Sequence, residues 1–312
     1  MKRNVYLIIL TIITILCIIA GTGYHLVRFG ISVAGGLLPS MQTFMDAVLD
    51  WNNDDSSDNT ESAASTKTVS SSQNLDAFTS IQADMNVMDL NVVSGDSYSI
   101  QYKASKKFVP EFEVKNNCLT IKQLQNVSFF PATRNAKCTV TVTVADSLDS
   151  VKIQSAVGDI TLLDQTITTF SLYTDAVDID LENCAFGKST FETDVGDFKL
   201  KNCTFTALSL YADAGDIDLE NCASDKGTIE TDAGDIDLKN CTFTNMDIST
   251  DAGDVDIDSK KDLSGYHIDL DTSDGDVTVN HKKQRHSYSH DGNLSDHTLT
   301  VSTDAGDIDL NY

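Results

Sequence analysis

The chain has 312 residues, enough for one large domain or two small ones. It carries 47 acidic residues against 22 basic ones, and this net charge of −25 excludes nucleic acid as a partner because a phosphate backbone would be repelled. With 3 prolines and 17 glycines, the chain is neither collagen-like nor a proline-rich rod.

The N-terminus predicts a membrane anchor. Lys2 and Arg3 precede residues 5–24, which carry no charge, and a helix of that length spans about 30 Å, the thickness of a bilayer core. A cleaved signal peptide is the competing interpretation, but its apolar part usually runs about 7–15 residues. Basic residues before the segment and aspartates after it predict a single-pass protein of the cell membrane, with its N-terminus inside and its bulk extracellular. Residues 1–28 therefore form the cytoplasmic start and the transmembrane anchor.

Two further segments separate the anchor from the rest of the chain. Residues 29–51 are a membrane-proximal amphipathic segment, in which residues 41–49 place their apolar side chains on one face of a short helix. That helix either packs on protein or lies on the membrane surface with Trp51 at the interface. Residues 52–74 are nearly free of apolar side chains, which predicts a flexible polar stalk.

A nineteen-residue repeat dominates the remainder, residues 75–312. The aspartate that opens each unit recurs at one spacing: Asp159, Asp178, Asp197, Asp216, Asp235 and Asp254. Two looser copies open at Asp276 and Asp307. A fixed period of this size indicates a stacked array in which each unit forms one rung.

Alternation within each unit indicates strands. Ile217 and Leu219 are apolar and Asp218 between them faces water, which is the two-residue period of a strand with one buried face. Glycine closes nearly every unit because the corner needs a positive φ; Val177 breaks this rule, so its corner must differ or be strained.

We therefore predict an all-β fold. It is a parallel β-solenoid, a stack of single rungs of about 19 residues, following one N-terminal transmembrane helix. Equivalent side chains such as Ile217, Ile236 and Val255 must then lie above one another at about 4.8 Å.

The GDIDL motifs, the T-D-A-G turns before them, the N-terminal anchor and the closing TLTVSTDAGDIDL resemble bacterial β-strand-repeat surface proteins of the putative-adhesin group. LiaG-like proteins, associated with envelope stress, are relatives of that group. The resemblance covers about residues 75–312 and implies a repeat fold, and it supplies no catalytic residues.

Stacked aspartates are the candidate metal ligands. Equivalent carboxylates one rung apart repel each other by about 0.8 kcal/mol even in water, and calcium bound between them would relieve the repulsion. The alternative needs no metal, because short aspartates also stabilise turns by accepting hydrogen bonds from nearby backbone N–H groups. The predicted calcium ligands are Asp213, Asp216, Asp218, Asp232, Asp235, Asp237, Asp251, Asp254 and Asp256.

Cysteines form a second column, at Cys184, Cys203, Cys222 and Cys241. Stacked in register, their side chains are parallel and poorly placed for disulfides, so we expect a buried column of free thiols. Cys118 and Cys138 are the more plausible disulfide candidates.

A basic loop over residues 280–293 contains Lys282, Lys283 and Arg285 together with three histidines. It is either a solvated insertion or a contact for an anionic polymer or lipid; zinc binding by the histidines is less favoured.

Function follows from these features only in outline. A catalytic pair of carboxylates occurs once in a protein, whereas these aspartates recur on every rung. We therefore expect no enzyme activity and no cofactor beyond calcium. The prediction is a membrane-anchored surface protein whose acidic solenoid binds a cell-envelope or host surface component. A carbohydrate-active β-helix enzyme, and a structural or regulatory subunit of a membrane complex, are the alternatives.

Overall fold

The structure, a computed structural model, describes residues 68–123 and 138–312. The unit Thr66–Tyr312 holds all of these residues. The predicted anchor, the membrane-proximal segment and the stalk up to residue 67 lie outside the described ranges. Within those ranges no helix has the length and apolar character to span a membrane.

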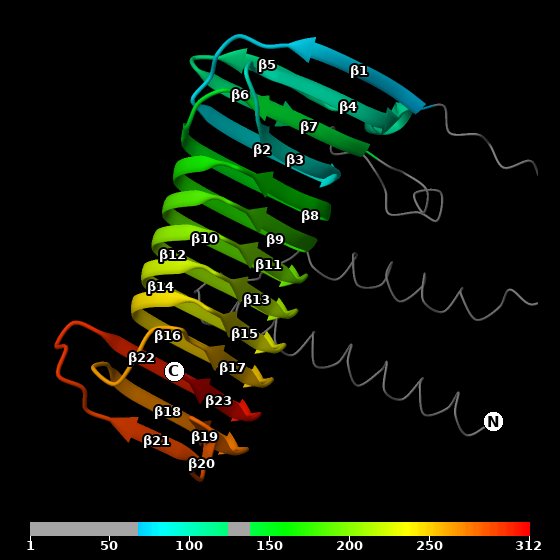
Figure 1. Cartoon of the computed structure of the whole chain (residues 1–312). Helices are drawn as coiled ribbons and strands as arrows, with labels where there is room; N and C mark the ends of the chain where they lie inside the picture. Colours follow the sequence, from blue (N-terminus) through cyan, green and yellow to red (C-terminus); the bar gives the residue numbers. More distant parts are fainter. Residues whose placement is uncertain (1–67, 124–137) are drawn as a thin grey trace, which may run out of the picture. The chain divides into compact units, whose positions relative to one another are not determined.

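Strands stack into two long columns that face each other across a common core (Figure 1). We call the column built from the longer strand of each repeat the long face. In spatial order the long face contains β5 (Glu111–Lys115), β6 (Cys118–Lys122), β2 (Ser80–Val87), the first part of β8 (Leu148–Leu163), the first part of β9 (Thr166–Glu182), β10 (Ala185–Val195), β12 (Thr204–Ala214), β14 (Ala223–Ala233), β16 (Thr242–Ala252), β22 (Thr298–Ala305), β18 (His267–Asp274) and β21 (Ser287–His290).

The second column, the short face, uses the four-residue strand of each repeat. In the same order it contains β1 (Thr68–Asn74), β4 (Ser99–Ser105), β7 (Cys138–Val144), β3 (Asp89–Ser94), the second parts of β8 and β9, β11 (Phe198–Lys201), β13 (Ile217–Glu220), β15 (Ile236–Lys239), β17 (Val255–Asp258), β23 (Ile308–Asn311), β19 (Val277–Val279) and β20 (Lys282–Lys283). A 3-10 turn, Lys106–Phe108, follows β4.

The predicted stacking is confirmed. Ile217 pairs with Ile236, and Ile236 pairs with Val255, in parallel register. All three side chains are fully buried, while Asp218 and Asp256 beside them are exposed. The two-residue period seen in the sequence therefore separates the core from the outer surface on every rung.

Glycine at the corner between the two faces is required by both conformation and space. Gly215 has φ of 147°, and a Cβ there would lie 2.1 Å from the carbonyl oxygen of Gly196 one rung away. The corner at Val177 does differ, as predicted: it is extended backbone within the uninterrupted strand β9, and the Val177 side chain is buried.

Spatial order departs from chain order at the C-terminal end. The strands β22 and β23, which end the chain, lie between the rung of β16 and β17 and the rung of β18 and β19. The looser repeat opening at Asp307 thus precedes the one opening at Asp276 in space. A similar arrangement holds at the other end, where β2 and β3 lie between β8 and the strands β6 and β7.

Both ends of the parallel stack are covered by antiparallel strands. The strands β1, β4 and β5 cover one end, and β20 and β21 cover the other (Figure 1). Such covering strands end the parallel pairing, which would otherwise offer a template to other chains.

The prediction of a stalk over residues 52–74 is wrong for its last seven residues. Thr68–Asn74 forms β1, which pairs with β4 along its whole length. Only Val69 in this strand is partly buried, so the strand is held by backbone hydrogen bonds and not by apolar burial.

Candidate functional site

The aspartates that open the repeats form a hydrogen-bonded column along the corner. The backbone N–H of Asp235 donates to Oδ1 of Asp216 at 3.0 Å, and that of Asp254 donates to Oδ1 of Asp235 at 2.9 Å. The column continues through Asp307, whose N–H donates to Asp254 at 2.7 Å, to Asp276. Each carboxylate thus accepts a backbone hydrogen bond from the next rung, which is the turn role predicted as the alternative to calcium binding.

A second group of predicted ligands, Asp213, Asp232 and Asp251, lies near the end of the long-face strands β12, β14 and β16. Asp175 and Asp194 occupy the same position on β9 and β10. Partial burial, followed by the charges of Asp213, Asp175 and Glu192, raises the pKa of Asp194 to about 6. The column therefore holds mutually repelling carboxylates.

This acidic column borders a cavity of about 310 Å³ at the N-terminal part of the repeat array. The cavity is lined by acidic residues and one tyrosine among others: Asp84, Asp175, Glu192, Asp194 and Tyr173. Its walls are therefore suited to cations and hydrogen-bond donors and unsuited to anions.

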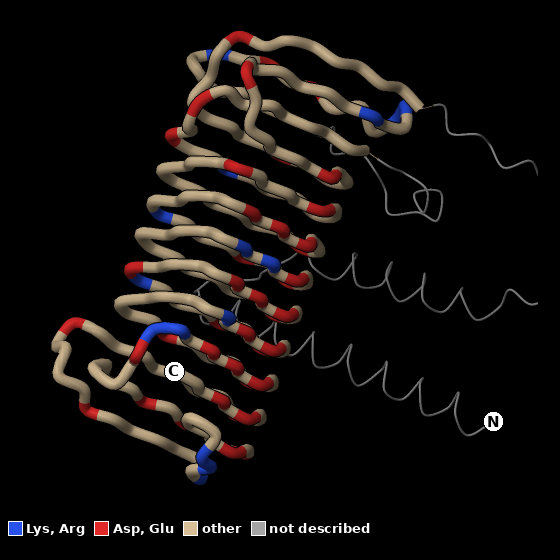
Figure 2. The backbone as a smooth tube through the Cα atoms, viewed as in Figure 1, with Lys and Arg blue, Asp and Glu red and all other residues tan. Residues whose placement is uncertain are grey.

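The third group, Asp218, Asp237 and Asp256, stacks in register on the outer side of the short face. Burial, and then the neighbouring Asp237 carboxylate, raise the pKa of Asp218. The ammonium group of Lys239 forms an ion pair with Asp237 at 2.5 Å, which reduces the repulsion between Asp237 and its acidic neighbours. Figure 2 shows acidic positions recurring rung after rung along this part of the stack.

The structure thus separates the nine predicted calcium ligands into three columns. Among the residues in the ranges 68–123 and 138–312, no three acidic, histidine or cysteine side chains are grouped so that they would hold a metal ion. Calcium binding remains a prediction, and the opening aspartates Asp216, Asp235 and Asp254 already accept backbone hydrogen bonds.

The cysteine column is confirmed as buried free thiols. Cys184, Cys203, Cys222 and Cys241 are each at most 3% exposed. Each thiol donates to a leucine carbonyl, as Cys222 does to Leu200 O at 3.3 Å. The column therefore acts as core packing with a weak polar contact, and its four cysteines form no disulfide.

The predicted alternative disulfide is not formed. Cys118 on β6 and Cys138 on β7 both carry free thiols. They belong to strands of opposite faces, and burial, followed by the charge of Asp89, raises the pKa of Cys138 to about 12.

An asparagine column was missed in the sequence. Asn183, Asn202, Asn221 and Asn240 all adopt φ between 53° and 56° at the second corner of the rung. The side-chain amide of Asn202 donates to Asn183 Oδ1 at 3.0 Å, and that of Asn221 donates to Asn202 Oδ1 at 3.3 Å. The signal was present, because an asparagine precedes each repeat cysteine, and asparagine tolerates left-handed backbone better than most residues.

The basic loop lies at the C-terminal end of the stack, where Figure 2 shows a cluster of positive charge. Lys282 and Lys283 form β20, which pairs with β19, and Lys283 contacts Asp276. His286 Nδ1 lies 2.7 Å from Gly275 O, and His290 Nε2 lies 2.8 Å from Ser264 O. The loop therefore adds one covering strand to each face, β20 beside β19 and β21 beside β18, with His286 and His290 in backbone contacts.

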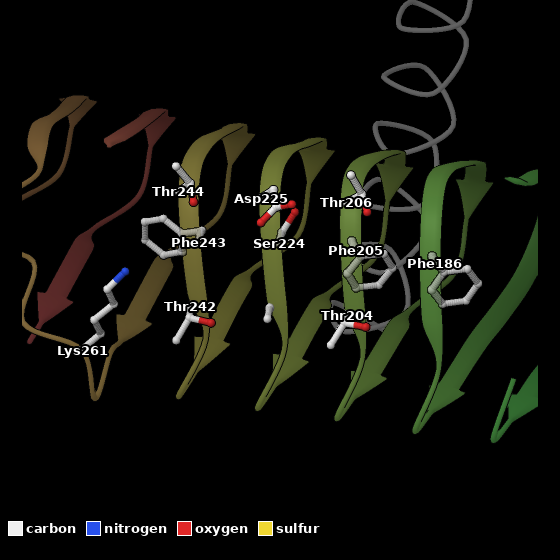
Figure 3. A pocket seen from close by; sticks show the side chains of 11 residues that line it. Phe186, Thr204, Phe205, Thr206, Ser224, Asp225, Thr242, Phe243, Thr244 and Lys261 are labelled. Carbon is white, nitrogen blue, oxygen red and sulfur yellow. The ribbon is translucent and has the colours of Figure 1, made fainter. Parts of the chain in front are cut away.

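A second cavity, of about 300 Å³, opens on the first residues of the long-face strands (Figure 3). It adjoins Ser224, where a serine stands between Phe205 and Phe243 of the neighbouring rungs. Sequence reasoning did not find this cavity, because it arises from one departure within a repeat whose other columns are regular.

Comparisons with known proteins agree with this architecture. The family model Toastrack DUF4097 matches residues 77–311. A putative adhesin from Bacteroides fragilis is similar in structure, with 17% identity and a TM-score of 0.50, over 80% of this chain and 98% of that chain. A putative adhesin from Parabacteroides distasonis matches with 12% identity and a TM-score of 0.50, over 79% of this chain and 98% of that chain.

No curated protein matches the sequence. The two structural likenesses show the fold, and the family model covers most of the repeat array. The resemblance drawn from the GDIDL motifs is confirmed: the chain belongs to the Toastrack DUF4097 family.

Proposed function

We propose that this protein is anchored in the cell membrane by residues 5–24 and displays its acidic solenoid outside the cell as a binding scaffold. Its partner is a component of the cell envelope or of a host surface. The names of the two structural relatives, both putative adhesins, support a binding role. The same aspartates recur on successive rungs, which favours a scaffold over an enzyme.

One observation carries the proposal: equivalent outward side chains recur in register over consecutive rungs. Asp218, Asp237 and Asp256 are paired directly, one above the next. A rigid array of identical groups favours a partner with repeated cationic or hydrogen-bonding groups, because each additional contact forms at high effective concentration. We propose further that divalent cations tune this contact by binding at the acidic columns.

Binding of the purified full-length chain to isolated envelope fractions tests the proposal. A variant with Asp213→Asn, Asp232→Asn and Asp251→Asn removes three charges from the long face, and one with Asp218→Asn, Asp237→Asn and Asp256→Asn removes three from the short face. We expect one of the two variants to bind at least tenfold more weakly and the wild-type contact to weaken with salt. Equal binding by all three proteins would reject a contact through the acidic columns.

Topology has its own test. A protease added to intact cells is expected to remove the solenoid while sparing an epitope placed before Lys2. Protection of the solenoid would contradict its extracellular placement. Hydrolysis of a wall polysaccharide by the purified chain would replace the scaffold with the enzyme alternative.

A further inference from the structure

Two tyrosines stand on the outer side of the long face. Tyr173 on β9 is 38% exposed and Tyr211 on β12 is 37% exposed, whereas the phenylalanines of the repeats are buried. Glu192 of β10, the strand between them, pairs in register with Tyr173 on one side and with Tyr211 on the other (Figure 1). The two rings therefore project from the same side, two rungs or about 10 Å apart. We call Tyr173, Glu192 and Tyr211 the tyrosine column.

Polar side chains flank the tyrosine column on both sides. Residues two positions away along a strand point to the same side of the sheet, so they share the outer surface with the column. On one side these residues carry hydroxyl groups: Ser171, Thr190 and Ser209, which pair in register. On the other side they carry carboxylates: Asp175, Asp194 and Asp213. Each ring thus lies between a hydroxyl group and a carboxylate.

The cavity of about 310 Å³ prolongs this column beyond Tyr173. Gln154 lines it, and Gln154 pairs with Tyr173 on one side and with Asp84 on the other. Binding sites for small ligands in proteins begin at about 300 Å³. Its lining therefore offers an exposed ring, an amide and several carboxylates within the volume of one small ligand.

The carboxylates of this surface are suited to hydrogen-bond donors. Burial raises the pKa of Asp175, and burial followed by the charge of Asp213 raises the pKa of Asp194 to about 6. Hydrogen bonds donated to these carboxylates would stabilise their charged form. An anionic partner would be repelled by the same groups.

A neutral sugar combines the two kinds of contact that this surface offers. Its hydroxyl groups donate hydrogen bonds to carboxylates and amides, and its apolar C–H face packs on an aromatic ring. In an extended β-1,4-linked glycan every second sugar presents the same face. This disaccharide repeat is comparable to the separation of Tyr173 and Tyr211, whereas a coiled α-1,4-linked chain lacks such a straight repeat.

We propose that the tyrosine column binds a neutral, extended β-1,4-linked glycan that runs along the stack. One sugar packs on the Tyr173 ring and the next but one packs on the Tyr211 ring. Glu192 accepts hydrogen bonds from the sugar between them, and the cavity beside Tyr173 holds the following unit. This assignment names the class of envelope or host component in the proposed function, and it rests on that function.

Calorimetric titration of the purified full-length chain tests the glycan site. The probes are chitohexaose and cellohexaose, with maltohexaose as the α-1,4-linked control and hexalysine as the cationic alternative. We expect saturable binding of at least one β-linked probe, unchanged by added salt because the ligand has no charge. Absence of binding by both β-linked probes overturns the proposal, whether or not hexalysine binds. Equally tight binding of maltohexaose would overturn the match between ring spacing and an extended chain.

Substitutions locate the binding. Tyr173→Ala and Tyr211→Ala each remove one ring and are expected to weaken binding by about tenfold. Tyr173→Phe keeps the ring and is expected to bind like the wild type. Thr161→Ala, a change on the outer side of the short face, is the control for an unrelated surface change. Unchanged binding in folded Tyr173→Ala and Tyr211→Ala variants would place the glycan elsewhere and reject the site.

Glu192 separates a sugar from a cation. Glu192→Gln keeps an oxygen acceptor and removes the charge, so we expect it to retain most of the glycan affinity. Glu192→Ala removes the acceptor as well and is expected to weaken binding severalfold. Equal losses in the two variants would show that the surface recognises charge, and would overturn the contact with a neutral sugar.

Binding to isolated envelope fractions distinguishes this inference from the proposed function. We expect the Tyr173→Ala, Tyr211→Ala double variant to bind these fractions more weakly than the wild type. Equal binding by both proteins would leave the scaffold function in place and overturn the glycan site. Binding of a β-linked probe without binding of any envelope fraction would support the site and count against the proposed envelope partner.

Discussion

The backbone N–H of Asp235 donates to the carboxylate of Asp216, 3.0 Å away on the preceding rung. This contact explains why aspartate opens each repeat, since the side chain satisfies a backbone donor of the next rung where the chain turns between the two faces. The free energy of this hydrogen bond also offsets part of the electrostatic repulsion between stacked carboxylates.

Removing one such acceptor is expected to destabilise the solenoid. Asp235→Ala leaves the N–H of Asp254 without its 2.9 Å partner, and we expect a loss of about 1 kcal/mol, as for the removal of a helix N-cap acceptor. Asp235→Asn retains an oxygen and is expected to lose less than half as much. Urea unfolding measures both variants. Equal losses for alanine and asparagine would show that the hydrogen bond contributes nothing measurable.

The corner glycine is expected to be more sensitive than any outward aspartate. Gly215→Ala introduces a side chain at φ of 147° and places its Cβ 2.1 Å from Gly196 O, which is rigid backbone. We expect a loss of about 3 kcal/mol in unfolding free energy. Gly227→Ala is the matched control, because the nearest atom there is the flexible Met246 sulfur. A Gly215→Ala variant as stable as the control would contradict the close approach between rungs.

The repeat made much of this fold predictable. A nineteen-residue period with fixed apolar columns determines which side chains stack, and Ile217 over Ile236 follows from it directly. The corner glycines and the buried cysteines follow in the same way, because a column needs the same local conformation on every rung.

The ends of the stack were not predictable by the same reasoning. A period predicts that rungs stack in the order in which they occur along the chain. The last strands, β22 and β23, instead lie between two earlier rungs, one of which is 31 residues before them in the sequence. Likewise, β1 lacks the alternation of apolar side chains that predicts a strand from sequence. It is a strand because its backbone pairs with the edge of β4. The gap at Ser224 escaped notice because a cavity depends on which neighbours fill the space.

Thiol labelling followed by peptide mapping is expected to separate the cysteines by burial. Cys118 is partly exposed and should react with iodoacetamide first, whereas the column from Cys184 to Cys241 should react only after denaturation. Hydrogen bonds with Cys203 and Cys241, followed by burial, raise the pKa of Cys222, which further lowers its reactive thiolate population. Rapid labelling of Cys222 in the folded chain would contradict a closed core.

Calcium binding by the acidic columns is expected to appear as a higher unfolding temperature. A ligand present at 100 times its dissociation constant stabilises the folded state by about 2.7 kcal/mol, which corresponds to several degrees for a domain of this size. Thermal melts in millimolar calcium and in chelator make the comparison, with the Asp218→Asn, Asp237→Asn, Asp256→Asn variant as the control. An unchanged midpoint in both solutions would remove calcium from the proposed function.

Acidification is expected to stabilise the solenoid through Asp194. Its pKa is about 6 in the folded chain and about 3.9 for an ordinary unfolded aspartate, so the folded state holds the proton more tightly. Stability therefore rises as the pH falls through about 6, and the gain is complete below about 4. Burial and nearby carboxylates also raise the pKa of Asp218 and of Asp256.

We expect Asp194→Asn to melt above the wild type at pH 7.5 and to gain less stability on transfer to pH 5. Asp149→Asn, an exposed change on β8, controls for the loss of one charge. Asp149→Asn is expected to keep the wild-type pH dependence. If Asp194→Asn keeps it too, the Asp194 carboxyl does not carry the effect.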